Sequence, residues 1–377
     1  MPIFWRYLLS HYLKVFVLSV IAFIFLLVIS RLHETASFAS LGAPLQALFY
    51  FILYQFPYIL PVAIPISCLL SALLLMQKLS REHEFIAFRA LGKSLPSIIA
   101  PLLVASALLS FLNFYIVSEV ATNSHLASKQ MVQELSSLNP LALLKNKSFL
   151  KRRDAFIKAG STKAGRSAKD VIVAVHQKDA ARLSLFFAKK LELINTDLTG
   201  SHVSFISSLP VTDAFDHLII ENQQETKTPA TEFTGLLKKT TARICPDHLH
   251  MRFLLARLIS EKKSLKIAKK ENTKDQKTLK NIVNSCYSEL ARRINMGLAP
   301  FVFTLMGVSF GIEISRKKVK KNIIIVSLLA AFSFATFFLA KSLATNALLS
   351  SFIYCFPLLL IITYSLWTLK RINRGIE

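Results

Sequence analysis

The chain has 377 residues, of which 53% are hydrophobic, and a formal net charge of +24. A mean hydropathy of +0.46 is too apolar for an ordinary soluble protein of this length. These values exclude a simple water-soluble enzyme or binding module and indicate a membrane protein with basic surfaces.

Two groups of three apolar stretches are each long enough to cross a bilayer. A spanning helix needs about 20 apolar residues, because the hydrocarbon core is about 30 Å thick. The predicted spans are Tyr12–Ser30, Leu45–Met76, Leu95–Val117, Met296–Ile314, Ile323–Ala340 and Leu348–Leu366. The sequence therefore predicts an α-helical membrane protein with six transmembrane helices, in which residues 1–117 and 295–377 flank an inserted domain at 118–294.

The second span contains three prolines at four-residue spacing, Pro57, Pro61 and Pro65. Each proline removes a backbone donor and bends the helix. Inside a membrane such breaks occur where neighbouring side chains or a cavity satisfy the freed carbonyls. The pattern fits a helix that lines a moving cavity and equally fits a static kink that serves packing.

A short polar segment, Gln77–Ser94, joins the second and third spans. Its apolar and charged positions predict an amphipathic helix along the membrane that ends at Gly92. Such a helix is typical of the contact between a transporter and an ATPase, and a plain interfacial helix is the alternative. Its last residues, Leu91-Gly92-Lys93-Ser94, resemble the end of a P-loop, but Ala87 stands where that motif needs glycine, so no ATP site is predicted.

The inserted domain begins with a polar helical stretch and continues with strand signals. Valine, isoleucine and phenylalanine are frequent in the signals, and turn residues separate them. They predict an all-β sandwich or barrel-like domain with strands at Ser148–Lys158, Val171–His176, Leu183–Asn195, His202–Ser207 and His217–Asn222. The pattern turns helical between Asp247 and Glu289, and Lys262–Lys280 is so rich in lysine that we expect a mobile, solvated connector there.

Basic residues of the short loops set the orientation. One side has 14 of them, whereas the short loops opposite hold only Arg31 and Lys341. Both termini and the 77–94 segment are therefore expected in the cytoplasm and the inserted domain outside. That domain has 30 Lys or Arg against 17 Asp or Glu, which favours an anionic lipid or glycolipid as its partner. An outside location argues against nucleic acid.

Several further residues are weak candidates for a site. Arg31 ends the first span, where a guanidinium can hold a lipid phosphate or simply anchor the helix end; Lys341 is the other basic candidate for lipid. His248 and His250 provide half of a metal site, and a structural role is expected instead. Glu119 is expected as a helix-end charge. Cys245 and Cys286 lie where a disulfide is chemically allowed, but nothing in the sequence establishes one.

The layout and three stretches resemble a known family, the LptF/LptG (YjgP/YjgQ) permeases of the lipopolysaccharide exporter. The stretches are RYLLSHYLKVFVLSVIAFIFLLVISRL at Arg6–Leu32, LSREHEFIAFRALGKS at Leu79–Ser94 and SELARRINMGLAPFVFTLMGVSFGI at Ser288–Ile312. The position of one outer β-domain between the third and fourth spans is also similar. The lysine-rich stretch Lys262–Lys280 is longer than is usual in the family.

The resemblance implies a permease without an ATPase site of its own, catalytic residue, cofactor or metal. It implies an extracytoplasmic β-jellyroll-like domain, a location in the inner membrane and lipopolysaccharide as cargo. The implied partners are an LptB-like cytoplasmic ATPase dimer, a paralogous permease that completes a heterodimer and an LptC-like periplasmic bridge. It places ATPase coupling at Glu84, Arg89 and Gly92, beside Phe85 and Phe88, and lipid phosphate contact at Arg31.

Two other function classes remain open from the residues alone. A permease of another ABC-type system for lipid or lipoprotein release is one alternative, although such proteins typically have four spans around their outer domain. A membrane-bound enzyme that acts on lipid is the other. It needs a nucleophile or paired carboxylates near the outer interface, and the sequence offers no such pattern.

Overall fold

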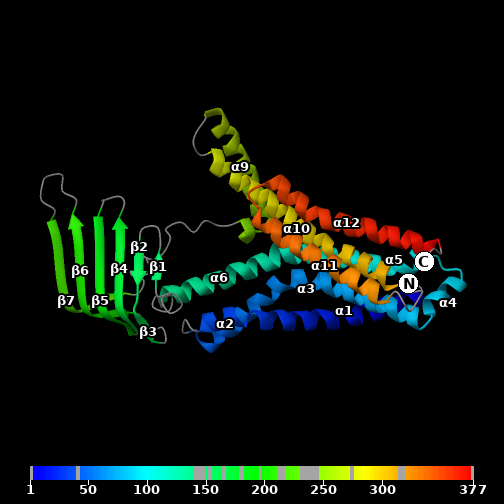
Figure 1. Ribbon diagram of the computed structural model, residues 1–377, viewed down its shortest axis with the longest axis horizontal. Helices are drawn as coiled ribbons and strands as arrows, with labels where there is room; N and C mark the ends of the chain where they lie inside the picture. The colour runs from blue at the N-terminus through cyan, green and yellow to red at the C-terminus, as the bar shows by residue number, and fades with distance from the viewer. Residues whose placement is uncertain are drawn as a thin grey trace. The chain divides into compact units, whose positions relative to one another are not determined.

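The structure of the protein is a computed structural model (Figure 1). The described residues are 3–39, 43–138, 149–151, 155–163, 167–177, 182–194, 197–209, 217–229, 246–271, 276–312 and 319–374. They form two compact units. One comprises residues 1–30, 54–126 and 244–377, and the other comprises residues 31–53 and 127–243.

Six helices among the described residues are long and apolar enough to cross a membrane, which confirms the predicted class. Most extend well beyond the predicted apolar stretches, because polar turns continue the helix past the hydrocarbon core. They are α1 (Ile3–Ser30), α3 (Leu45–Arg81), α5 (Leu95–Tyr115), α10 (Gln276–Gly311), α11 (Val319–Ser342) and α12 (Ala347–Asn373).

The third span does not stop at Tyr115. A π-helical turn, η1 (Ile116–Val120), leads directly into α6 (Ala121–Leu138). A π-turn widens the helix and leaves carbonyls available to other donors. Helices therefore run through both predicted domain limits, 117/118 and 294/295, because a change in hydropathy marks the edge of an apolar layer and not the end of a helix.

Helix α10 packs against α3 through glycines one turn apart. A Cβ atom on Gly307 would lie 2.6 Å from the Leu69 carbonyl oxygen, and one on Gly311 would lie 2.7 Å from Cβ of Met76. Helices inside membranes associate largely by such close backbone approach. The small-xxx-small spacing thus makes α10 the centre of its unit, where apolar clusters join it to α1, α3, α5, α11 and α12.

The described strands form one antiparallel sheet of seven, in which neighbours in sequence are mostly neighbours in space (Figure 1). The strands are β1 (Phe149–Lys151), β2 (Ala155–Lys158), β3 (Ser161–Lys163), β4 (Ser167–Gln177), β5 (Arg182–Ile194), β6 (Asp197–Leu209) and β7 (His217–Pro229). Asp170 in β4 and His202 in β6 have φ values of 51° and 50°. Buried residues near these two positions, among them Ala168, Val171 and Val203, belong to one apolar cluster.

The same unit contains the short helix α2 (Leu32–Ala39) and the C-terminal half of α6. Phe38 of α2 stacks on Phe51 of α3 with ring centroids 4.3 Å apart. Met131, Val132 and Leu135 of α6 pack against this pair. The apolar contacts hold α2 in place although half of its own residues are polar.

The lysine-rich stretch predicted as a mobile connector is largely helical instead. Helix α9 (Met251–Glu271) and the start of α10 enclose it, and Leu254 and Leu258 of α9 pack on Cys286 of α10. The prediction failed because the anchoring leucines precede the lysines. Residues 272–275 and Cys245 lie outside the described residues, so a disulfide between Cys245 and Cys286 is not tested.

Candidate functional site

The segment between α3 and α5 is a short helix, α4 (Glu84–Ala90), and not one helix over residues 77–94. Helix α3 continues to Arg81, and His83 then adopts a left-handed φ of 58° that starts a new direction. Gly92 has a φ of 75°, and no described atom lies within 4 Å of the place that a Cβ would take there. Glycine is favoured here for its backbone conformation rather than for space, as expected at a helix C-terminus.

One face of α4 is built into the helix bundle. Phe85 is 4% exposed and packs in the cluster that includes Leu8 of α1 and Ile98 of α5. Phe88 meets Phe4 edge to face, with centroids 4.5 Å apart. These two phenylalanines, predicted beside the ATPase-coupling residues, contact their own chain and hold α4 on the bundle.

Glu84 also faces α1. The Tyr7 hydroxyl donates to the two carboxylate oxygens of Glu84, at 3.1 and 3.2 Å. The carboxylate is half-buried, so part of it remains open to a second partner. Sequence reasoning missed Tyr7, because the two residues lie 77 positions apart.

The other face of α4 is exposed. Arg89 and Lys93 are open to solvent, and Ile86 and Leu91 are 58% and 77% exposed. Exposed apolar side chains among cations on a short helix are typical of a docking surface. The surface left for a partner therefore includes Ile86, Arg89, Leu91 and Lys93, beside the open part of the Glu84 carboxylate.

The two basic lipid candidates occur in different units. Arg31 forms an ion pair with Glu34 of α2 at 2.9 Å, and its side chain is 30% exposed. Lys341 lies in the last turn of α11 and is exposed. The Glu34 partner was visible in the sequence as an i,i+3 pair, but α2 was not predicted as a helix.

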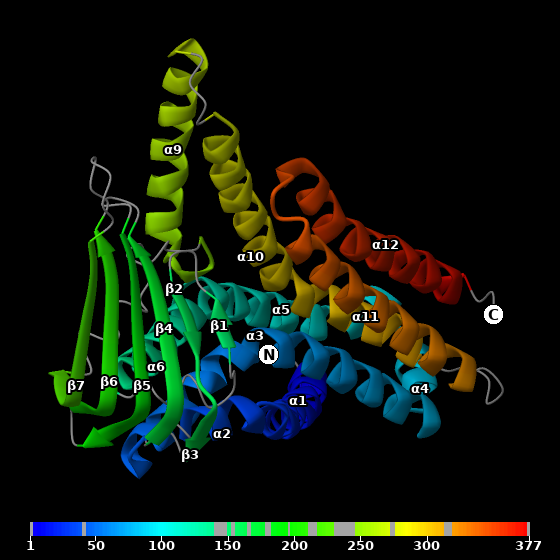
Figure 2. The same ribbon diagram turned by 60° about the vertical axis from the view of Figure 1, so that its left-hand side comes forward.

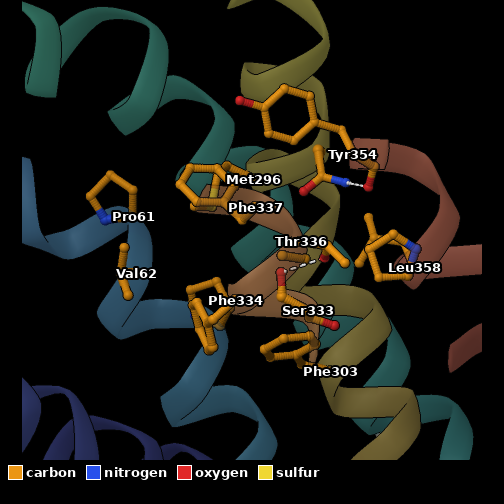
Figure 3. Close-up of a pocket in the computed structure, with 14 residues that line it drawn as sticks. Pro61, Val62, Met296, Phe303, Ser333, Phe334, Thr336, Phe337, Tyr354 and Leu358 are labelled. Atoms are coloured by element: carbon orange, nitrogen blue, oxygen red, sulfur yellow. Dashed lines mark hydrogen bonds between the residues drawn. The ribbon is translucent and has the colours of Figure 1, made fainter. Parts of the chain in front are cut away.

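An apolar cleft opens between α3, α10, α11 and α12. Figure 3 shows Pro61 and Val62 of α3 on one side and Tyr354 and Leu358 of α12 on the other. Aromatic side chains of α11, among them Phe334 and Phe337, fill the space between. The prediction that the proline-containing helix lines a cavity agrees with this geometry.

A neighbouring asparagine compensates for one of the missing proline donors. Pro65 cannot donate to the Pro61 carbonyl four residues earlier. Asn113 of α5 is fully buried and donates from Nδ2 to the Met296 carbonyl at 2.7 Å and to the Pro61 carbonyl at 3.5 Å. Asn113 thus ties α3, α5 and α10 together beside the cleft.

A buried charge cluster lies where α10 approaches its apolar part. Glu289 accepts two hydrogen bonds from Arg292, at 2.6 and 2.7 Å, and one from Arg293 at 2.8 Å. Arg293 has no exposed surface and also donates to the carbonyls of Leu249 and, at 3.4 Å, Ser118 of the π-turn. These residues belong to the SELARRI stretch, in which sequence reasoning assigned no functional role to any single side chain.

The segment before α9 surrounds this cluster. Burial raises the pKa of Asp247 in the short helix η3 (Pro246–His248), and the nearby Glu289 carboxylate adds to that rise. His250 hydrogen-bonds to Glu119 through Nδ1. Glu119 lies in the π-turn inside the continuous helix from α5 to α6, so the prediction of a helix-end charge was wrong, and its carboxylate has a specific partner instead.

His248 and His250, for which a structural role was expected, have separate contacts. The His248 ring packs on His125 with centroids 4.7 Å apart, and His125 stacks on Tyr58 at 4.9 Å. His250 turns to Glu119. Among the described residues, no group of three metal-binding side chains comes together.

Comparison with known proteins gives one family. A search of curated proteins found no match. The model of the lipopolysaccharide export system permease LptF/LptG matches residues 6–371, which is nearly the whole chain. With six membrane-capable helices and an inserted antiparallel sheet in place, the chain belongs to the LptF/LptG family of lipopolysaccharide export permeases.

Proposed function

We propose that this permease is the membrane half of an ATP-driven lipopolysaccharide extractor, powered by a separate LptB-like ATPase dimer in the cytoplasm. The observation that carries the proposal is the division of α4 into two faces. Phe85 and Phe88 fix it to the bundle, while Ile86, Arg89 and Leu91 remain exposed. A helix bound on both sides can pass movement from one partner to the other.

Force applied to α4 reaches several spans at once. The cluster around Phe85 includes Leu8 of α1, Leu79 of α3 and Ile98 of α5 as well as Val308 of α10. Packed interiors have low compressibility and move as units. Closure of the ATPase dimer would therefore shift these helices together.

The cleft suits the acyl chains of the cargo. Its walls are mostly proline, phenylalanine and aliphatic side chains of α3, α10, α11 and α12. A paralogous permease would complete the cavity, and Arg31 and Lys341 are the candidates for contact with lipid phosphates. The β-domain would then pass the lipid to an LptC-like bridge. The lipid is thus moved by change of cavity shape, without covalent chemistry on this chain.

The proposed orientation follows the basic side of the molecule. Short loops and ends rich in lysine and arginine stay in the cytoplasm. Lys93 after α4 and Arg371 at the end of α12 belong to that side. The protein is accordingly placed in the inner membrane with both termini cytoplasmic and the sheet domain in the periplasm.

The experiment compares three variants in vesicles that contain the assembled transporter. Glu84→Lys reverses a charge at the proposed ATPase contact and is expected to lower lipid release per ATP by about fivefold or more. Tyr7→Phe removes only the hydrogen bond inside the chain and should change release by less than about twofold. Glu84→Gln should lie between them.

Two results would contradict the coupling role. Normal release by Glu84→Lys in a correctly assembled complex rules out a charge contact at this position. Equal losses in Tyr7→Phe and Glu84→Lys show that the carboxylate acts only by holding α4 on α1.

A further inference from the structure

Helix α9 and the first turns of α10 form a hairpin with an unusual exposed face. The two helices lie side by side (Figures 1 and 2), with Leu254 and Leu258 turned toward Cys286. The face of α9 opposite these leucines has basic and apolar side chains beside Ser260, and no acid among its described members. Its exposed members are Arg252, Phe253, Ala256, Ile259, Ser260, Lys263 and Ile267, with Leu255 and Lys266 at one edge.

Contacts with the rest of the bundle fix the depth of this hairpin. Asn284 of α10 donates from Nδ2 to the Thr345 carbonyl, at 2.7 Å, in the loop between α11 and α12. Spans α11 and α12 leave the apolar layer at that loop. The turn of α10 around Asn284 therefore lies at the level where hydrocarbon gives way to headgroups.

The lysines of α9 lie at the same level. The Lys262 ammonium donates to the Tyr287 hydroxyl at 3.0 Å and lies 5.7 Å from the centre of that ring. Helix α9 runs antiparallel to α10 and rises about 1.5 Å per residue along its axis. Lys263 and Lys266 therefore lie at most about 6 Å further from the membrane than Lys262 along that axis. Ile259 and Leu255 lie on the opposite, inward side of Lys262.

We propose that the exposed face of α9 binds the phosphates of anionic lipids at the membrane surface and inserts Leu255 and Ile259 below them. An interfacial helix combines an apolar part at the acyl boundary with lysines that reach the headgroups. The stretch 262–280 contains eight lysines and only two acidic residues, so it complements a negative surface. A helix face exposed only to water would be expected to mix acids among its cations.

This contact anchors the hairpin at the start of α10. That helix continues without a break through the Glu289–Arg293 cluster to the glycines that pack on α3. Lipid composition at the surface therefore acts on the central helix of the bundle. The anchoring does not depend on coupling through α4.

Hydrogen exchange of the full membrane complex in nanodiscs tests the proposal. One preparation contains phosphatidylcholine alone, and in the other phosphatidylglycerol replaces one third of it. Amides of residues 255–267 are expected to exchange at least about fivefold more slowly in the anionic discs, because each lysine near an anionic surface strengthens membrane binding by about fivefold. Salt near 1 M should remove the difference, because it shortens the screening length to about 3 Å.

Matched variants identify the side chains. Lys263→Gln with Lys266→Gln should abolish most of the slowing in anionic discs. The control, Lys189→Gln with Lys227→Gln, removes two exposed lysines of the sheet and should keep it. Equal exchange of the wild type in both lipids overturns the proposal, and so does full slowing in the α9 variant. If exchange is slow to the same degree in both lipids and becomes faster when a partner subunit is removed, a protein covers this face instead.

Discussion

Arg293 carries a positive charge with no exposed surface at the start of an apolar span. Sequence spacing alone puts Glu289, Arg292 and Arg293 on neighbouring positions of one helix face. It cannot show that carbonyls of Ser118 and Leu249 complete the shell, because they come from segments far away in the chain. The sequence therefore shows which charged residues are neighbours on the helix, but it does not show that Arg293 is buried.

The first prediction concerns the counterion of this cluster. Glu289→Gln leaves the buried guanidinium group of Arg293 and the partly buried one of Arg292 without this negative partner, so the stability of the protein should fall by about 3–5 kcal/mol. Thermal unfolding in detergent measures the loss. Glu261→Gln is the control, since its pair with Arg257 is partly exposed and 3.8 Å long, and should cost less than about 1 kcal/mol. Similar small losses in both variants would contradict a structural role for the buried charges.

The second prediction concerns pH and Asp247. Burial and Glu289 raise its pKa in the folded state, so the folded protein holds this proton more tightly than the unfolded chain does. The associated stability is present below the unfolded pKa of about 3.9 and is lost as pH rises through the higher folded pKa. At neutral pH the charged carboxylate thus costs stability. Asp247→Asn should raise the melting temperature more at pH 7 than near pH 4; an equal shift at both pH values would contradict this origin.

The third prediction separates two roles of Arg31. If the guanidinium holds a lipid phosphate, Arg31→Glu should reduce lipid crosslinking from a neighbouring photo-reactive residue, and Arg31→Lys should reduce it less. Glu34→Gln should increase crosslinking, because it removes the competing carboxylate at 2.9 Å. If Arg31 only anchors the helix end, Arg31→Lys and Arg31→Gln should be equally mild, and Glu34→Gln should have no effect.

At the scale of elements, hydrophobic length predicted every span, and runs of valine, isoleucine and phenylalanine between turn residues located most of the sheet. Strand β3 was missed because Ser161–Lys163 is too short and polar to stand out. The connection between the second and third spans was predicted as one helix, whereas a left-handed His83 divides it. Short elements depend on contacts and single backbone angles, which periodicity does not report.

The fourth prediction tests the packing of α10 on α3. Gly307→Ala places a methyl group about 2.6 Å from the Leu69 carbonyl oxygen, so the helices must separate, at a cost of about 1–3 kcal/mol. The melting temperature of the solubilised protein reports the change. Ala335→Val on the exposed side of α11 is the control and should have little effect. A stable Gly307→Ala protein would show that the two helices can move apart freely.

At the scale of the whole molecule, sequence reasoning identified the family and the segment that contains α4. It assigned Phe85 and Phe88 to a partner, since an amphipathic pattern does not reveal which surface covers the apolar face. Only packing shows that both rings meet their own bundle and that Ile86 and Leu91 stay outside. The sequence therefore located the segment, whereas which of its side chains pack inside the chain could be seen only in the structure.

The fifth prediction concerns topology. In a background without native cysteines, Gly160→Cys in the sheet domain should react with an impermeant thiol reagent in cells whose outer membrane is opened. Lys93→Cys after α4 should react only when the inner membrane is also broken, because basic short loops remain in the cytoplasm. The reverse labelling pattern would invert the proposed orientation.

The three prolines of α3 make the stiffness of this helix depend on the direction of bending. Pro57, Pro61 and Pro65 lie close to one side of the helix and remove backbone hydrogen bonds there. The opposite side keeps its backbone hydrogen bonds. Such a helix is flexible in one plane and stiff in the plane at right angles to it. Pro61 and Pro65 line the cleft. Bending of α3 in the flexible plane therefore changes the width of the cleft without breaking a backbone hydrogen bond.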